Sequence, residues 1–100
     1  MIEVDPGLPG AEIVAQAFAD WERHEVTSAV LGVTIIAPRL RLFGFEVFDL
    51  ELEETPELLL YSRLSEEQTL DPYSAYNAML RRLFSFAAAV EAEYFRARSG

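Results

Sequence analysis

The chain has 100 residues, with 17 acidic residues against eight basic ones, and its net charge is −9. It contains no cysteine and no lysine, which excludes disulfides, thiolate zinc sites, thiol nucleophiles and lysine Schiff bases. The negative charge also opposes binding to nucleic acid and to anionic lipid, because basic side chains must neutralise phosphates in both cases. We therefore expect no nucleic-acid partner and no membrane partner.

Length and composition predict one domain over residues 1–100, since chains of this size form a single core. Half of the residues are apolar, 51% in all, which is enough to build that core and argues against disorder. The N-terminal residues lack the basic and apolar regions of a signal peptide, and the absence of cysteine is typical of a reducing compartment. We expect a cytoplasmic protein.

The first predicted element is a helix that begins near Gly10 and ends near His24 or Glu25. Prolines and glycines in residues 5–10 are typical of a turn before it. Apolar residues then recur three and four positions apart, which indicates an amphipathic helix with one buried side. These residues are Ile13, Val14, Ala17, Phe18 and Trp21.

Three strands are expected next, over about 26–37, 39–53 and 57–64. Residues 26–37 are rich in Val, Ile and Thr and are apolar at both odd and even positions, which indicates a strand covered on both faces. Residues 39–53 alternate, with a change of parity at Gly44 that predicts a bulge or bend there, or burial of both faces in the middle of the strand. Proline turns at 37–38 and 54–57 separate the strands.

A long C-terminal helix is expected over about 72–96, because Asp71 can cap its free N–H groups and Pro72 suits the first helical position. The element order predicts an α+β fold of two layers. An N-terminal helix and the C-terminal helix would cover one face of a three-stranded antiparallel meander.

Apolar residues exceed what one covered sheet face needs, and this predicts self-association. The first strand would be a sheet edge without charge or proline, which natural proteins rarely leave exposed. We expect a homo-oligomer, most simply a homodimer, because closed symmetric dimers are the commonest assembly. The alternative is that a strand bent at Gly44 covers the second face. The predicted interface residues are Val30, Leu31, Val33, Ile35, Phe43, Phe45 and Val47.

Two sets of polar residues are candidates for a chemical role. His24 is the only histidine and lies four residues after Asp20, an arrangement suited to acid–base catalysis or to a structural role at a helix end. Asp49, Glu51 and Glu53 alternate along one strand, where they would not converge on a metal ion. This acidic row indicates a solvated strand end or a docking site for a basic partner. No catalytic residue, metal or cofactor is predicted.

The leading hypothesis is a non-enzymatic, acidic, cytoplasmic protein that self-associates and binds a protein partner, one with a basic surface if the acidic row is used. The alternative is a carrier or sensor of a small apolar ligand, with a pocket between the long helix and the sheet. A small enzyme using His24 and nearby carboxylates is the third hypothesis. The predicted pocket residues are Tyr76, Leu80, Phe84 and Val90.

Overall fold

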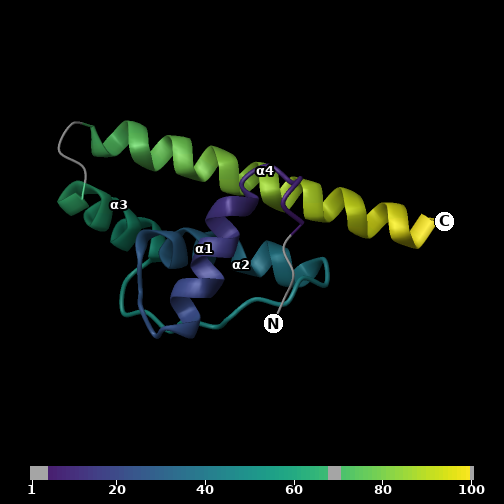
Figure 1. Ribbon diagram of the computed structural model, residues 1–100, viewed down its shortest axis with the longest axis horizontal. Coiled ribbons are helices and arrows are strands. Elements are labelled where there is room, and N and C mark those ends of the chain that lie inside the picture. The colour runs from purple at the N-terminus through teal and green to yellow at the C-terminus, as the bar shows by residue number, and fades with distance from the viewer. Residues whose placement is uncertain (1–4, 68–70, 100) are drawn as a thin grey trace.

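The computed structural model describes residues 5–67 and 71–99, and this part of the chain folds into four helices without a strand. The helices are α1 (Ala11–Glu22), α2 (Ser28–Leu42), α3 (Pro56–Glu67) and α4 (Pro72–Ser99). The long α4 lies along one side of the molecule, and the other three helices all lie on the same side of it (Figure 1). The predicted α+β fold with a three-stranded meander is therefore wrong.

Both predicted terminal helices are confirmed. Helix α1 begins directly after Gly10, and α4 begins at Pro72. The Asp71 carboxylate accepts hydrogen bonds from the Ser74 backbone N–H at 3.1 Å and from the Ser74 hydroxyl at 2.6 Å. This cap satisfies a donor at the helix start that has no partner within the helix, as the sequence suggested.

The predicted first strand is instead helix α2, which packs against α1, α3 and α4. Because neighbours surround α2, apolar residues are required on most of its circumference, and eight of its 15 residues are buried. A helix buried in this way has the same unbroken apolar sequence as a strand covered on both faces. The Thr27 hydroxyl caps the helix by accepting a hydrogen bond from the Val30 N–H at 3.4 Å.

The proline turn that was expected after residue 37 does not form, since α2 continues through Pro38 to Leu42. Proline lacks the N–H that would bond to the carbonyl one turn earlier. Pro38 lies on the exposed side of the helix, where water can satisfy that carbonyl. Burial of the residues around it stabilises the helix despite the missing bond.

The predicted third strand is helix α3, and the predicted hairpin turn at 54–57 is instead the start of this helix. The Thr55 hydroxyl accepts a hydrogen bond from the Leu58 N–H at 3.4 Å, and Pro56 is the first helical residue. This arrangement resembles the one at Asp71 and Pro72. Leu60 and Leu64 lie one turn apart and are both buried, as a helix requires.

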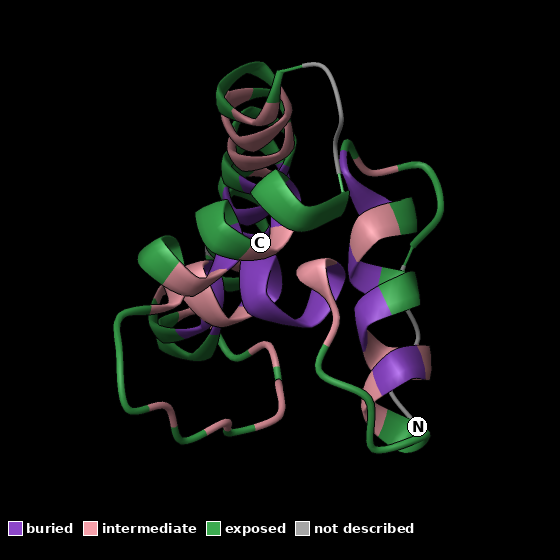
Figure 2. Cartoon of the chain, turned by 90° about the vertical axis from the view of Figure 1, so that its left-hand side faces the viewer, coloured by how far each residue is buried: buried purple, intermediate pink, exposed green. Residues whose placement is uncertain are grey.

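The core consists of two clusters of buried side chains. The larger one lies between α1, α2 and α4 and includes Val14, Val30, Val33 and the fully buried Phe86. The smaller one joins Leu31 of α2 to the buried leucines of α3. Figure 2 shows the buried residues concentrated along α1 and α2, while the connection between α2 and α3 is exposed or intermediate.

Candidate functional site

The connection between α2 and α3 is the most unusual part of the described chain. Gly44 ends α2 with a φ of 79°, a left-handed conformation that glycine adopts without steric strain. The Phe45 N–H turns back to the Leu40 carbonyl at 2.9 Å. The chain then runs on without helix or turn to residue 52. We call residues 45–54 the acidic segment.

Apolar side chains hold the acidic segment against the helices. Phe45 packs edge-on against Phe86, with ring centroids 5.6 Å apart. Phe48 stacks on Trp21 of α1 at 4.7 Å and an interplanar angle of 15°. Leu50 packs against both core clusters. Beyond the backbone hydrogen bond of Phe45, the segment is thus held along the surface by aromatic and aliphatic contacts.

The carboxylates of the acidic segment are all exposed; they are Glu46, Asp49, Glu51, Glu53 and Glu54. The alternating exposed and intermediate residues are visible in the lower loop of Figure 2. Among these carboxylates, the described chain provides an ion pair only for Asp49, whose oxygen lies 3.8 Å from the Arg41 guanidinium. The row of carboxylates predicted from the sequence therefore exists, on an extended connection rather than on a strand.

Backbone N–H groups of the acidic segment are also available to donate hydrogen bonds. From Glu46 to Glu54, none donates a hydrogen bond to another group in the described part of the chain. Among the carbonyls of the same residues, the Phe48 oxygen accepts a hydrogen bond from the Arg41 side chain at 2.8 Å. An extended chain with unpaired donors and acceptors has the hydrogen-bonding character of a sheet edge.

The predicted interface residues are divided between the core and the half-buried positions beside it. Val30, Leu31 and Val33 are buried within the chain itself, with at most 3% of their surface exposed. The other four predicted residues are half-buried and pack against the large core cluster: Ile35, Phe43, Phe45 and Val47. In the helical fold, α1, α3 and α4 therefore cover side chains that a sheet would have left exposed to a partner.

The predicted pocket residues are not brought together. Tyr76 and Leu80 pack against the small core cluster, where burial raises the pKa of the Tyr76 hydroxyl and nearby Glu57 adds to the effect. Phe84 lies outside, with 47% of its surface exposed. Of the four predicted pocket residues, Val90 is the one that lines a cavity of about 380 Å³, an open depression over the C-terminal half of α4. Its other lining residues are Asp5, Leu8, Phe43, Gly44, Phe45, Glu93, Tyr94 and Ala97.

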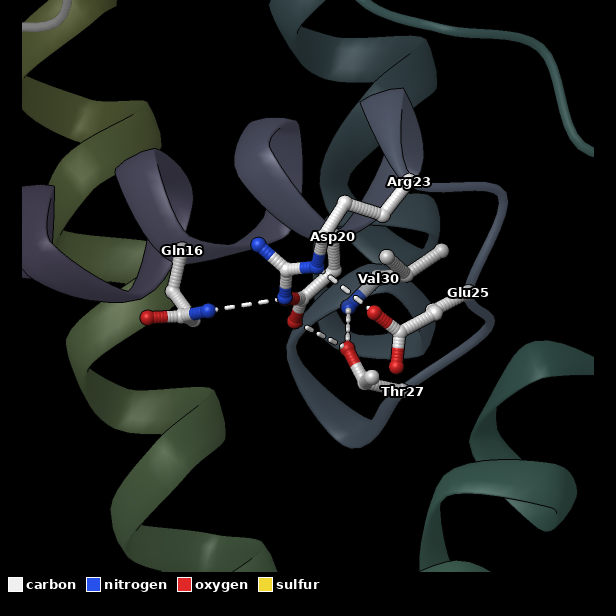
Figure 3. A network of polar contacts seen from close by, with 6 residues as sticks. All are labelled: Gln16, Asp20, Arg23, Glu25, Thr27 and Val30. Carbon is white, nitrogen blue, oxygen red and sulfur yellow. Dashed lines mark hydrogen bonds and ion pairs between the residues drawn. The ribbon is translucent and has the colours of Figure 1, made fainter.

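Asp20 and His24 do not form the catalytic pair considered from the sequence. His24 is exposed at the end of α1 with a φ of 60°, an uncommon conformation for a residue other than glycine. The Asp20 carboxylate is instead directed at the start of α2 (Figure 3), where it accepts a hydrogen bond from the Thr27 hydroxyl at 2.6 Å. Gln16 and Arg23 donate to the same carboxylate.

This network lowers the pKa of Asp20, chiefly through the hydrogen bond from Thr27. Burial of the carboxyl acts in the opposite direction, and the contacts from Gln16 and Arg23 lower the pKa further. Gln16 and Arg23 belong to α1 and its C-cap, whereas Thr27 is the N-cap of α2, so the ionised carboxylate joins the two helices. We assign it a structural role.

Three further observations concern function. Comparison of the chain with protein-family models, with curated proteins and with solved structures found no match. Within residues 5–67 and 71–99, no three histidine or acidic side chains are placed to hold a metal ion. The described helices include none with the length and apolar character of a membrane span.

Proposed function

We propose that this chain is a non-enzymatic protein-binding module that captures an extended, basic segment of a partner protein along the acidic segment. The observation that supports this most directly is that the backbone N–H groups from Glu46 to Glu54 donate no hydrogen bond within residues 5–67 and 71–99. Extended peptides commonly bind by adding a strand to such an edge, since main-chain hydrogen bonds supply the affinity.

The charge pattern supports a basic partner. Alternate residues of an extended chain lie about 7 Å apart on one side. Asp49, Glu51 and Glu53 follow this spacing and are all exposed. A paired strand with Lys or Arg at every second position would place its cations beside these carboxylates, and opposite charges on adjacent strands stabilise the pairing. The partner's intervening residues would be uncharged.

The proposal predicts binding of a labelled peptide of eight residues that alternates Arg with Val. Fluorescence anisotropy at low salt should give a dissociation constant in the micromolar range, and the affinity should fall as salt is added. A peptide with Glu in place of Arg should not bind. Failure of the Arg peptide to bind at about 100 μM would contradict the proposal.

Two controls separate strand pairing from simple charge attraction. Methylating alternate backbone nitrogens of the peptide removes the donors needed for pairing but keeps every charge, so affinity should fall at least about tenfold. Glu51→Arg should weaken binding, whereas Glu66→Arg, an equal charge change on the exposed surface of α3, should have a smaller effect. Equal binding of the methylated and unmethylated peptides would show that charge alone is responsible.

A second candidate function, binding of a small apolar ligand, is supported by the depression that Phe43, Val90 and Tyr94 line. Pockets for such ligands are apolar with a few polar groups, and Asp5 and Glu93 supply the polar groups here.

This candidate predicts that the neutral dye N-phenyl-1-naphthylamine increases its fluorescence when mixed with the protein. Ala97→Trp fills the depression and should reduce the affinity about fivefold. Ala78→Trp, on an exposed part of the same helix, should leave it unchanged. Similar dye binding by both variants would rule this depression out as the binding site.

A further inference from the structure

Arg41 shows how the acidic segment holds a guanidinium group. This residue is in the last turn of α2, and its side chain donates a hydrogen bond to the Phe48 carbonyl at 2.8 Å. The same nitrogen atom lies 3.8 Å from a carboxylate oxygen of Asp49. A backbone carbonyl and the carboxylate of the next residue thus hold one arginine side chain together. We call two such acceptors a carbonyl–carboxylate pair.

The same pair of acceptors recurs two residues further along the acidic segment. An extended chain repeats every two residues, at a spacing of about 7 Å. Exposure follows this repeat, because Phe48 and Leu50 are half-buried whereas Asp49 and Glu51 are exposed. Within residues 5–67 and 71–99, no group donates a hydrogen bond to the Leu50 carbonyl, and no cation is paired with Glu51. Leu50 and Glu51 therefore offer a second carbonyl–carboxylate pair.

Both pairs are held in place by the packing of neighbouring side chains. The Phe48 ring stacks on Trp21, with centroids 4.7 Å apart, and Leu50 packs against both core clusters. These contacts fix the backbone at the two residues that carry the carbonyls. A ligand that binds there does not have to order the segment first, and this favours its affinity.

We propose that the acidic segment selects arginine side chains of its partner. Arg41 fills the first carbonyl–carboxylate pair from within the chain, and the second pair, at Leu50 and Glu51, binds an arginine of the partner. This inference rests on the proposed function, because it names the residue type of the basic segment. A guanidinium group has five N–H donors in one plane and is more weakly hydrated than an ammonium group. It therefore suits a site with both a carbonyl and a carboxylate better than lysine does.

Arginine binding at the second pair is compatible with pairing of the partner as a strand. A carbonyl oxygen has two lone pairs, so the Leu50 carbonyl can accept from a guanidinium and from a backbone N–H. The guanidinium uses acceptors alone, and the N–H groups of the segment stay available to the partner's carbonyls. Because Arg41 already accompanies Asp49, the partner's arginine is needed at Glu51 rather than at Asp49.

A comparison of two peptides tests the selection of arginine. The labelled peptide that alternates Arg with Val should bind at least about fivefold more tightly than its counterpart with Lys at the same positions. Fluorescence anisotropy at one salt concentration measures both dissociation constants. Equal affinities would overturn the selection of arginine but leave the binding of a basic segment standing. Absence of binding by both peptides would overturn the two proposals together.

Two substitutions of similar shape locate the arginine within the segment. Glu51→Gln should weaken binding of the Arg peptide about fivefold. Asp49→Asn is an equal change of charge, but it should weaken binding less than about twofold because Arg41 fills that position. In Arg41→Gln the first pair is free, so Asp49→Asn should then weaken binding about fivefold as well. All three residues are exposed, so the variants should fold like the unaltered chain.

Two results would contradict the role given to Arg41. Equal losses for Asp49→Asn and Glu51→Gln in the otherwise unaltered chain would show that Arg41 does not fill the first pair. Weaker binding of the Arg peptide by Arg41→Gln than by the unaltered chain would show that Arg41 keeps the segment in shape rather than filling a binding position.

Discussion

Replacing Asp20 by alanine is expected to lower the free energy of unfolding by about 3 kcal/mol. Only 3% of Asp20 is exposed, and its carboxylate accepts hydrogen bonds from Gln16, Arg23 and Thr27. Alanine removes the acceptor and leaves these donors without their partner at the junction of α1 and α2. A domain of this size has a total stability of about 5–10 kcal/mol, so the loss should be plain in urea denaturation.

The same network predicts how stability depends on pH. The pKa of Asp20 in the folded chain lies below its ordinary value of 3.8, so the folded state holds the ionised form more strongly than the unfolded state does. Its contribution is therefore complete above about pH 5 and is lost as the pH falls below 4 through the folded-state pKa. The measurement is the urea midpoint between pH 2.5 and 7.

Asp20→Asn is the control for this pH dependence, because asparagine keeps the shape of the side chain but does not titrate. Other carboxylates titrate in both proteins, so the difference in unfolding free energy between them isolates Asp20. That difference should shrink as the pH falls from 5 to 2.5. A difference that stays constant over this range would show that the ionised carboxylate is not what joins the helices.

Replacing Gly10 by alanine is expected to destabilise the protein by about 3 kcal/mol. Gly10 precedes α1 with a φ of 76°, a conformation that strains any residue with a Cβ. An alanine Cβ would also lie 2.5 Å from the Arg82 carbonyl oxygen of α4. This neighbour is backbone within a helix and cannot move aside, so α1 and α4 would have to separate.

Gly44→Ala is a matched control that separates strain from crowding. Gly44 has a similar φ of 79°, but a Cβ built there meets no atom within 4 Å. It should therefore show the conformational penalty alone, about 1 kcal/mol. Thermal and urea denaturation of the two variants give the comparison. Equal destabilisation would contradict the close packing of α1 against α4 that the structure describes at Gly10.

The extent to which this fold could be predicted differs from helix to helix. α1 and α4 have the apolar spacing of amphipathic helices. Their predicted starting signals, Gly10 and Asp71-Pro72, lie where the two helices begin. The start of α3 carries an equally clear signal in Thr55-Pro56, but the same two residues also suit a turn between strands. Pro38 reinforced the error, since a proline inside a helix is unusual.

The candidate site was predicted in part. The alternating carboxylates at 49, 51 and 53 do lie on extended chain and do face solvent. That the backbone N–H groups beside them donate no hydrogen bond within the described part of the chain could not be deduced, since it depends on α2 ending at Leu42, just before Gly44, and on α3 being a helix.

The sequence by itself determined the acidic character of this protein, the absence of thiol and lysine chemistry, and the two terminal helices, because these follow from composition and local patterns. Only the tertiary structure decided that residues 28–42 form a helix. An unbroken apolar sequence is equally compatible with a strand covered on both faces and with a helix surrounded by three other helices. The contacts that α2 makes with α1, α3 and α4 remove this ambiguity. They also leave the acidic segment extended on the surface.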